Sequence, residues 1–268
     1  MKQRIDSWLV EQGYFESREK AQRAIMAGEV SVDGKRVEKP GQPVAGAPTV
    51  AIVASGPQYV SRGAHKLAKA LTAFQIGVAG RICLDAGAST GGFTDLLLQS
   101  GAARVYAVDV GYGQLAWKLR QDSRVMVFER ENIRYFNPER LPDAPDLITA
   151  DLSFISLGLV LPKFKELIRP AGDLITLIKP QFEAGKEKVG KKGVVRDSGV
   201  HREVLERMLR LGPSLGWTLT GLTFSPIRGP EGNIEYLGHW RLSADCAAAP
   251  DLEPARVVEE AWNMLRGS

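Results

Sequence analysis

The sequence has few cysteines and no long apolar run, and each shortage excludes a class of protein. Only two residues, Cys83 and Cys246, are cysteines, so a disulfide framework is excluded and a reducing compartment is expected. Asp6, Glu11 and Glu16 lie where a secretory signal peptide needs an apolar core. No apolar run approaches the roughly 18 residues of a membrane-spanning helix. These absences predict a cytoplasmic protein with no membrane segment.

Net charge is also small. The 268 residues include 35 Lys plus Arg and 31 Asp plus Glu, which leaves a net charge of +4. With 44% hydrophobic and 25% charged residues, the composition excludes wholesale disorder, collagen and coiled coil. At roughly 100–200 residues per domain, the length predicts one large domain or two unequal ones. So small an excess of positive charge indicates an anionic partner only where it is clustered.

The chain changes character near residue 55. Before that point, apolar periodicity predicts a helix over residues 3–12 and a second helix that begins after Ser17 and ends at Gly28. Asp33-Gly34 is typical of a two-residue hairpin turn, and residues 50–53 add a strand. We therefore expect a small α+β module over residues 1–55, a linker over 56–63 and a second domain over 64–268.

A set of residues in the module carries a family resemblance. They are Arg4-Ile5-Asp6, Leu9, Ser17-Arg18, Ala21, Ile25, Gly28, Val30, Val32-Asp33-Gly34 and Pro40. On these residues the module resembles the RNA-binding domain shared with ribosomal protein S-four.

Basic residues in this region are the candidates for RNA binding. Residues 1–66 hold ten basic and seven acidic side chains, and charge alone favours a solvated face that binds no partner. The resemblance instead implies RNA binding, in which each neutralised phosphate releases counterions. The candidate contacts are Arg4, Arg18, Arg23, Lys35, Arg36 and Arg62.

Strands and helices alternate from residue 64 onward. The predicted strands are residues 81–85, 105–110, 124–128, 146–151 and 173–179, with helices at 64–74, 93–99 and 159–168. This alternation favours a mostly parallel, doubly wound α/β sheet. The two last strands, 217–224 and 233–242, are separated by only a short Pro/Gly turn, which suits an antiparallel pair. A final helix is predicted over residues 254–266. Seven strands that end in this way are typical of the Rossmann-like class I fold of S-adenosylmethionine-dependent methyltransferases.

A glycine-rich turn follows the first of these strands. Gly87, Gly91 and Gly92 do not follow the G-x-G-x-x-G spacing of dinucleotide folds, and Asp85 before them would repel a pyrophosphate. Asp109 ends the next strand, 22 residues after Gly87, where an acid can hold a ribose diol. A glycine turn alone is weak evidence, but the combination favours S-adenosylmethionine over a nicotinamide dinucleotide. The expected cofactor contacts are Asp85, Gly87, Ser89, Thr90, Gly91, Gly92, Phe93, Asp109, Asn132 and Asp151.

The residues near the predicted site limit which atom of the substrate could accept the methyl group. Transfer to cytosine C5 needs a cysteine nucleophile, and Cys83 lies in an apolar strand. Methyltransferases that act on exocyclic base amines usually carry an Asn/Asp-Pro-Pro-aromatic turn after the fourth strand. At that position this chain has residues 151–154, Asp-Leu-Ser-Phe. A hydroxyl acceptor remains, and it needs a base to take its proton. A lysine serves as that base only if burial or a neighbouring cation lowers its pKa.

Four charged residues are predicted at one rim of the sheet: one at the start of the domain, two at the ends of strands and one in the last strand. They are Lys66, Asp151, Lys179 and Glu235. Each alone reads as an ordinary surface charge, but four at one rim of an α/β sheet indicate a site. The set resembles the Lys-Asp-Lys-Glu tetrad of ribose 2′-O-methyltransferases of the RrmJ/FtsJ type. We expect Lys179, its pKa lowered by Lys66, to be the general base, with the acids holding both lysines. No metal is expected.

Two further features are compatible with RNA contact. The loop 181–196 carries Lys188, Lys191 and Lys192 and is either a mobile basic lip or a plain solvated loop. Three aromatic residues are candidates for stacking on an extruded base or, equally, for core packing. They are Tyr112, Phe154 and Phe182.

Long segments throughout the chain together resemble one family. They are residues 60–67, 85–94, 109–115, 151–156, 179–183 and 232–236. They are similar to the TlyA family of bacterial ribosomal RNA methyltransferases, also called hemolysin A. The resemblance implies cytidine 2′-O-methylation, with ribosomal RNA or ribosomal subunits as partners and a monomer favoured. A non-catalytic ribosome-assembly factor and a membrane-active hemolysin remain as alternatives.

Overall fold

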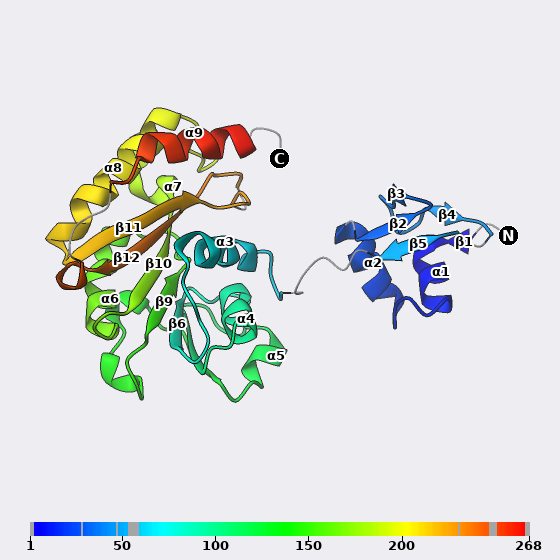
Figure 1. The fold of residues 1–268 in the computed structure, drawn as a ribbon, viewed down its shortest axis with the longest axis horizontal. Coiled ribbons are helices and arrows are strands. Elements are labelled where there is room, and N and C mark those ends of the chain that lie inside the picture. The colour runs from blue at the N-terminus through cyan, green and yellow to red at the C-terminus, as the bar shows by residue number, and fades with distance from the viewer. Residues whose placement is uncertain are drawn as a thin grey trace. The chain divides into compact units, whose positions relative to one another are not determined.

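Two compact units make up the chain, Met1–Gln58 and Tyr59–Ser268 (Figure 1). The computed structural model describes residues 3–27, 29–46, 48–52, 59–229, 231–246 and 251–265. The predicted helix end at Gly28 and residues 56–58 of the predicted linker lie outside the described residues. Residues 59–63, assigned to the linker from the sequence, belong instead to the second unit, because the Val60 N–H donates to the Asp95 carboxylate at 2.8 Å.

The first unit contains the predicted helices and hairpin. Its elements are β1 (Gln3–Arg4), α1 (Ile5–Glu11), α2 (Arg18–Ala27), β2 (Val30–Val32), β3 (Lys35–Arg36), β4 (Pro43–Val44) and β5 (Val50–Ile52). Ser17 caps α2 by accepting the Lys20 N–H at 3.3 Å. Asp33 and Gly34 both have positive φ, 51° and 75°, as a two-residue hairpin turn requires. The β1·β4 pair was not predicted, since strands of two residues carry no periodic signal.

A buried carboxylate, Asp6, organises the start of this unit. It accepts hydrogen bonds from Arg4 at 2.8 Å, Arg18 at 3.0 Å and Gln22 at 2.7 Å. The hydrogen bond from Arg4, and then those from Gln22 and Arg18, hold the pKa of the Asp6 carboxyl well below its usual range, although burial opposes them. Asp6 therefore joins α1 to α2 and orients two arginines whose side chains are half exposed.

The second unit is built on one sheet with the order β11-β12-β10-β9-β6-β7-β8. Its strands are β6 (Ile82–Ala86), β7 (Arg104–Asp109), β8 (Val125–Glu129), β9 (Leu147–Ala150), β10 (Asp173–Ile178), β11 (Trp217–Phe224) and β12 (Tyr236–Leu242). Only β12 runs antiparallel to its neighbours, β10 and β11. The predicted doubly wound sheet with an antiparallel final pair is confirmed.

Helices cover both faces of this sheet (Figure 1). They are α3 (Ala64–Phe74), α4 (Gly92–Gln99), α5 (Trp117–Arg120), α6 (Leu161–Leu167), α7 (Pro180–Glu183), α8 (Ser198–Ser214) and α9 (Pro254–Leu265), with 3-10 turns η1 (Ile133–Tyr135), η2 (Pro138–Arg140), η3 (Leu157–Leu159), η4 (Lys186–Lys188) and η5 (Ser243–Asp245). The predicted helix over 64–74 is confirmed to the residue. The long helix α8 was missed because Gly199, Gly212 and Pro213 obscure its period.

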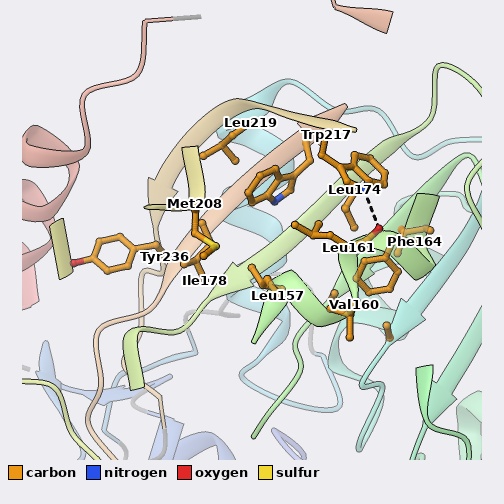
Figure 2. Packing of buried hydrophobic residues seen from close by; sticks show 14 of the residues in the cluster. Leu157, Val160, Leu161, Phe164, Leu174, Ile178, Met208, Trp217, Leu219 and Tyr236 are labelled. Carbon is orange, nitrogen blue, oxygen red and sulfur yellow. Dashed lines mark hydrogen bonds between the residues drawn. The ribbon is translucent and has the colours of Figure 1, made fainter. Parts of the chain in front are cut away.

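Alternate residues of the strands feed two separate cores. Cys83 packs with α3 and α4 on one face, whereas Leu84 packs on the other face. Figure 2 shows the core on the face of Leu84. In it Trp217 lies beside Leu161 and donates its Nε1–H to the Leu161 carbonyl at 2.9 Å. Both faces of the sheet are therefore covered, and its carboxyl edge is left to form a site.

Of the helices that the structure describes, none combines the length and the apolar character needed to cross a membrane.

Replacing Asp6 with alanine should lower the free energy of unfolding of the α1–α2 region by about 2 kcal/mol. Loss of a buried ion-pair partner typically costs about 3–5 kcal/mol, but the two arginines are half exposed and recover hydration. Hydrogen exchange of the α1 and α2 amides in the full chain measures the change. Because the folded pKa is depressed, the contribution of Asp6 is present above about pH 4 and fades as the pH falls.

The control is Lys20→Ala, which removes an exposed pair with Glu16 and should leave the exchange rates of the α1 and α2 amides unchanged, because exposed ion pairs contribute little. Equal effects of Asp6→Ala and Lys20→Ala on exchange would contradict the role given to Asp6.

Candidate active site

A cavity of about 290 Å³ opens at the carboxyl edge of the sheet in the second unit. Its wall is formed by the residues that precede and begin α3, the loop after β6, the ends of β9 and β10, and the turn between β11 and β12. The carboxyl ends of parallel strands converge there, as expected for an open α/β sheet.

The four charged residues predicted for the site come together, and all of them except Glu235 line this cavity. Lys66 Nζ lies 2.6 Å from Glu235 Oε2 and 3.2 Å from Asp151 Oδ2. Lys179 Nζ lies 2.6 Å from the other carboxylate oxygen of Asp151. Segments 85 and 169 residues apart in the chain thus meet in one network. The pairing that makes burial of these charges tolerable is present.

Burial and charge compete at this network. Burial is the largest influence on the pKa of Lys66 and would lower it, but Asp151 and Glu235 together outweigh burial and raise that pKa. Burial would likewise raise the pKa of Asp151, but Lys179 and Lys66 together lower it. Lys66 therefore keeps its proton, and Asp151 stays a carboxylate that contacts the amines of both Lys66 and Lys179.

The glycine loop makes close backbone contacts that a side chain would prevent. A Cβ at Gly87 would lie 2.7 Å from the Asp151 carbonyl oxygen, and its φ is +82°. A Cβ at Gly92 would lie 2.9 Å from Ser61 Oγ. Gly91, at φ +96°, packs against the Leu119 side chain. The loop therefore brings bare backbone against the cavity, which suits the close approach of a bound cofactor.

Asp109 is held in one orientation at the end of β7. Its carboxylate oxygens accept the Ser89 N–H at 2.8 Å and the Gly111 N–H at 2.6 Å. Each oxygen keeps further acceptor capacity, so the residue fits the predicted contact with a ribose diol. Asn132 is exposed and caps η1 by accepting the Arg134 N–H at 3.0 Å, and the structure gives it no contact with the cavity wall.

Asp85 does not line the cavity, and the prediction that it contacts the cofactor is corrected here. Its carboxylate is buried and accepts both the N–H and the hydroxyl of Thr94, at 2.9 and 2.7 Å. Asp85 lies two residues after Cys83 in β6, so it faces the same side, towards α4. Burial raises the pKa of the Asp85 carboxyl to about 7, and the Thr94 hydrogen bonds oppose this only in part. Asp85 thus anchors the start of α4 beneath the loop.

Two arginines and a serine in the wall complete the site. Arg62, grouped with the N-terminal module from its charge, lines the cavity of the second unit. Arg228 and Ser153 were missed, although Ser153 Oγ accepts a hydrogen bond from Lys179 at 3.2 Å. Ser153 lies in the motif already singled out, whereas nothing in the spacing of the β11–β12 turn marks Arg228.

The other predicted RNA contacts lie in varied surroundings. Arg23, Lys35 and Arg36 are exposed in the first unit, and Lys191 and Lys192 are exposed in the second. Lys188 pairs with Glu203.

The segment 181–196, predicted as a mobile basic lip or a plain solvated loop, contains regular secondary structure. It contains α7 and η4, the Gly190 N–H donates to the Val194 carbonyl at 3.1 Å, and the Val195 N–H donates to Asn233 Oδ1 at 3.1 Å.

Among the candidate aromatic residues, Phe154 is the most exposed. It has 91% of its surface accessible and a left-handed backbone, with φ at +63°. Its ring centroid lies 5.2 Å from that of Phe182, which in turn lies 5.7 Å from Lys179 Nζ. Tyr112 is also exposed, and the Arg130 guanidinium covers its ring at 4.4 Å. Core packing is thus excluded for Phe154, whose side chain is exposed to solvent.

Within the described residues, no group of three or more His, Cys, Asp or Glu side chains is arranged to hold a metal ion.

Asp85→Asn should change how stability depends on pH. Between its ordinary pKa of 3.8 and about 7, the folded protein keeps a proton on Asp85 that the unfolded chain releases. Stability of the wild type therefore falls with rising pH over this range, by at most about 1.4 kcal/mol per pH unit, relative to the neutral variant. Thermal unfolding of both proteins from pH 4 to 9 measures it. A difference in Tm that does not vary between pH 4 and 7 would contradict the assignment.

Comparison with known proteins agrees with this geometry. Residues 59–242 match the FtsJ-like methyltransferase family, and residues 3–47 match the S4 domain. The 16S/23S rRNA (cytidine-2′-O)-methyltransferase TlyA of Mycobacterium tuberculosis is 48% identical over 96% of this chain and 97% of its own length. Hemolysin A of Brachyspira hyodysenteriae is 42% identical over 88% of this chain and 99% of its own.

A solved structure supports the same relationship. A candidate hemolysin from Streptococcus thermophilus superposes with a TM-score of 0.75 at 43% identity, covering 99% of this chain and 97% of that one. The resemblance noted in the sequence is therefore confirmed, as are the fold class and S-adenosylmethionine as the cofactor of the family. The chain belongs to the TlyA family, in which an S4 domain precedes an FtsJ-like methyltransferase domain.

Proposed function

We propose that this protein methylates the 2′-oxygen of cytidine in ribosomal RNA, acting in the cytoplasm. The observation that carries the proposal is the buried network of Lys66, Asp151, Lys179 and Glu235 beside the glycine loop. The TlyA relative is named for this reaction on 16S and 23S rRNA. The S4 match supports RNA as the partner.

The cavity wall fits S-adenosylmethionine. We assign the loop residues Gly87 to Phe93 to its amino-acid portion, Asp109 to its ribose diol and Asp151 to the edge nearest the reacting centre. When bound, the cofactor supplies a methyl group on a positively charged sulfur. Asn132 is kept as a contact of the adenine, and Asp85 is now assigned to holding the loop.

Lys179 is the proposed base for the acceptor hydroxyl. A ribose hydroxyl is a poor nucleophile until its proton is removed, and Lys179 accepts that proton in its neutral form. Lys66, whose raised pKa keeps it charged, holds Asp151 and Glu235 in place. Asp151 and Ser153 in turn orient the Lys179 amine towards the cavity. Fixing these groups in advance removes much of the entropic barrier to reaction.

Phe154 and Phe182 are the proposed platform for an extruded base. A nucleotide inside folded RNA must leave its stack to reach a buried lysine. A non-glycine residue with positive φ is strained, and such strain collects at functional sites. The exposed Phe154 ring contacts Phe182, whose ring lies near Lys179, and this arrangement supports base stacking at Phe154.

Tritiated S-adenosylmethionine offered with small subunits, large subunits, assembled ribosomes and naked RNA tests the function. Nuclease digestion then locates the label. Label on a cytidine 2′-oxygen is the expected result, and the accepting particle names the substrate. Label on a base would overturn the acceptor. Cofactor binding without transfer to any of them would favour another acceptor, and no cofactor binding would favour the ribosome-assembly role.

Lys179→Ala should lower kcat for methyl transfer by about 10²–10⁴, because a positioned general base contributes that much. The dissociation constant of S-adenosylmethionine should stay within about threefold, as measured by calorimetry, since the assigned cofactor contacts remain. Lys163→Ala, which removes a lysine paired with Glu166 on α6, is the control and should leave kcat unchanged. Normal turnover by Lys179→Ala would remove Lys179 as the base.

Phe154→Ala should lower kcat/KM for the RNA by about 5- to 100-fold, since stacking of one base on an aromatic ring contributes about 1–3 kcal/mol. Phe154→Trp should retain most activity because it keeps a stacking surface. Met264→Ala, at an exposed apolar side chain on α9, is the control. If Phe154→Ala and Met264→Ala behaved alike, base stacking at Phe154 would be disproved.

A further inference from the structure

The cavity carries more positive charge than the catalytic network needs. Lys66 and Lys179 are balanced by Asp151 and Glu235. Arg62 and Arg228 line the same cavity, and within the described residues neither of them pairs with a carboxylate. The site therefore has an uncompensated positive charge that comes from these two arginines.

Arg228 is held in place but leaves part of its guanidinium unused. Its two terminal nitrogens donate to backbone carbonyls, one to Gly232 at 3.3 Å and the other to Leu265 at the end of α9. Its Nε is buried and has no partner among the described residues. An unpaired buried donor is unfavourable by about 1–3 kcal/mol, so it is typically satisfied by a ligand or by water.

The turn that carries Arg228 is attached to the catalytic network. The Ser225 N–H donates to the Glu235 carbonyl at 2.8 Å, and the Gly229 N–H donates to the Asn233 carbonyl at 2.9 Å. Gly229 packs so closely on Glu235 that a Cβ there would lie 2.7 Å from Oε1. Arg228 is thus fixed on the side of the cavity where Glu235 lies.

The backbone at Arg62, in the segment just before α3, is held by contacts of the residues next to it. The Val60 N–H bonds to Asp95, and Ser61 Oγ lies against Gly92 of the glycine loop. The Arg62 carbonyl accepts the His65 N–H at 3.2 Å in the first turn of α3. Arg62 is exposed, lines the cavity and has no ion pair within the described residues.

A cationic cofactor does not neutralise this charge. S-adenosylmethionine has a sulfonium, an ammonium and a single carboxylate, so its overall charge is positive. The missing anion must then come from the acceptor, and in RNA every ribose is flanked by phosphodiesters. Arginine is well suited to them because its planar donors match two phosphate oxygens.

We propose that Arg62 and Arg228 bind the phosphodiesters next to the target ribose and so position its 2′-hydroxyl at Lys179. The proposal rests on the RNA acceptor of the proposed function. It assigns these arginines to substrate placement, and their loss should therefore affect RNA and leave cofactor binding intact.

Equilibrium binding of a ribosomal RNA fragment to the full chain over a range of salt concentrations, without cofactor, tests this. Arg62→Gln and Arg228→Gln should each weaken binding about 10- to 100-fold at low salt. Each should also reduce the slope of log affinity against log salt by roughly 0.7–1, the value for one lost phosphate contact. Arg228→Lys should keep the slope, since it keeps the charge. Arg256→Gln, at an exposed arginine on α9, is the control and should change neither quantity.

Two parallel measurements separate the alternatives. Calorimetry with S-adenosylmethionine should give unchanged affinity for both glutamine variants, and thermal unfolding reports any loss of the α9 contact made by Arg228. An unchanged salt slope overturns the proposal. Weaker cofactor binding with an unchanged slope would assign the arginines to the cofactor carboxylate, and a lower Tm with an unchanged slope would assign Arg228 to structure alone.

The outcomes also distinguish this proposal from the function on which it rests. Ribose methylation by the wild type with unaltered RNA binding by both variants overturns only the arginine assignment. A reduced salt slope of RNA binding in the variants, with no ribose methylation by the wild type, overturns the ribose as the acceptor. That result would still support the phosphate contacts of the two arginines. No RNA binding by the wild type, together with no ribose methylation of any particle offered, overturns both.

Discussion

Lys66 and its two carboxylate partners hold the active site together. The ammonium group comes from α3, whereas Asp151 follows β9 and Glu235 precedes β12, so one side chain joins three elements that are distant in the sequence. In a largely buried setting such a cation is tolerated only while both acids are present, and the acids in turn need the cation. Each charge is thus a condition for the burial of the others.

Close packing of the backbone ties the cofactor loop to this network. Gly87 lies against the carbonyl of Asp151, and Gly92 lies against Ser61, which precedes α3. The same residues that pair the lysines therefore also define where the loop runs. A buried carboxyl beneath the loop, Asp85, secures the start of α4 without entering the cavity. The glycine loop and the network of charged residues are therefore held in place by the same backbone contacts.

The two units use buried acids in different ways. In the first unit, Asp6 gathers two arginines whose side chains remain half exposed, so it orients charge on the surface. In the second unit, Asp151 sits between two lysines that are buried, so the charges are satisfied internally. The first arrangement leaves arginine side chains at the surface, whereas the second keeps its charges inside the fold.

The sequence alone determined the architecture and the four charged residues that meet at the candidate site. Periodicity predicted the parallel strands and the helix over 64–74. The strand ends that carry Asp151 and Lys179 predicted the rim at which Lys66 and Glu235 join them. These predictions held because strand alternation and the convergence of carboxyl ends follow from local geometry. The helix α8 escaped prediction because its glycines and proline mask the apolar period.

Only the tertiary structure decided which polar groups face the cavity. It turned Asp85 towards Thr94 and α4, moved residues 59–63 from the linker into the second unit, and placed Arg228 in the cavity wall with Lys66, Asp151 and Lys179. It also exposed Phe154 with a left-handed backbone, where the sequence allowed either stacking or core packing. The direction of a side chain at a strand end or in a turn depends on packing against distant elements, and local sequence patterns carry no record of that packing.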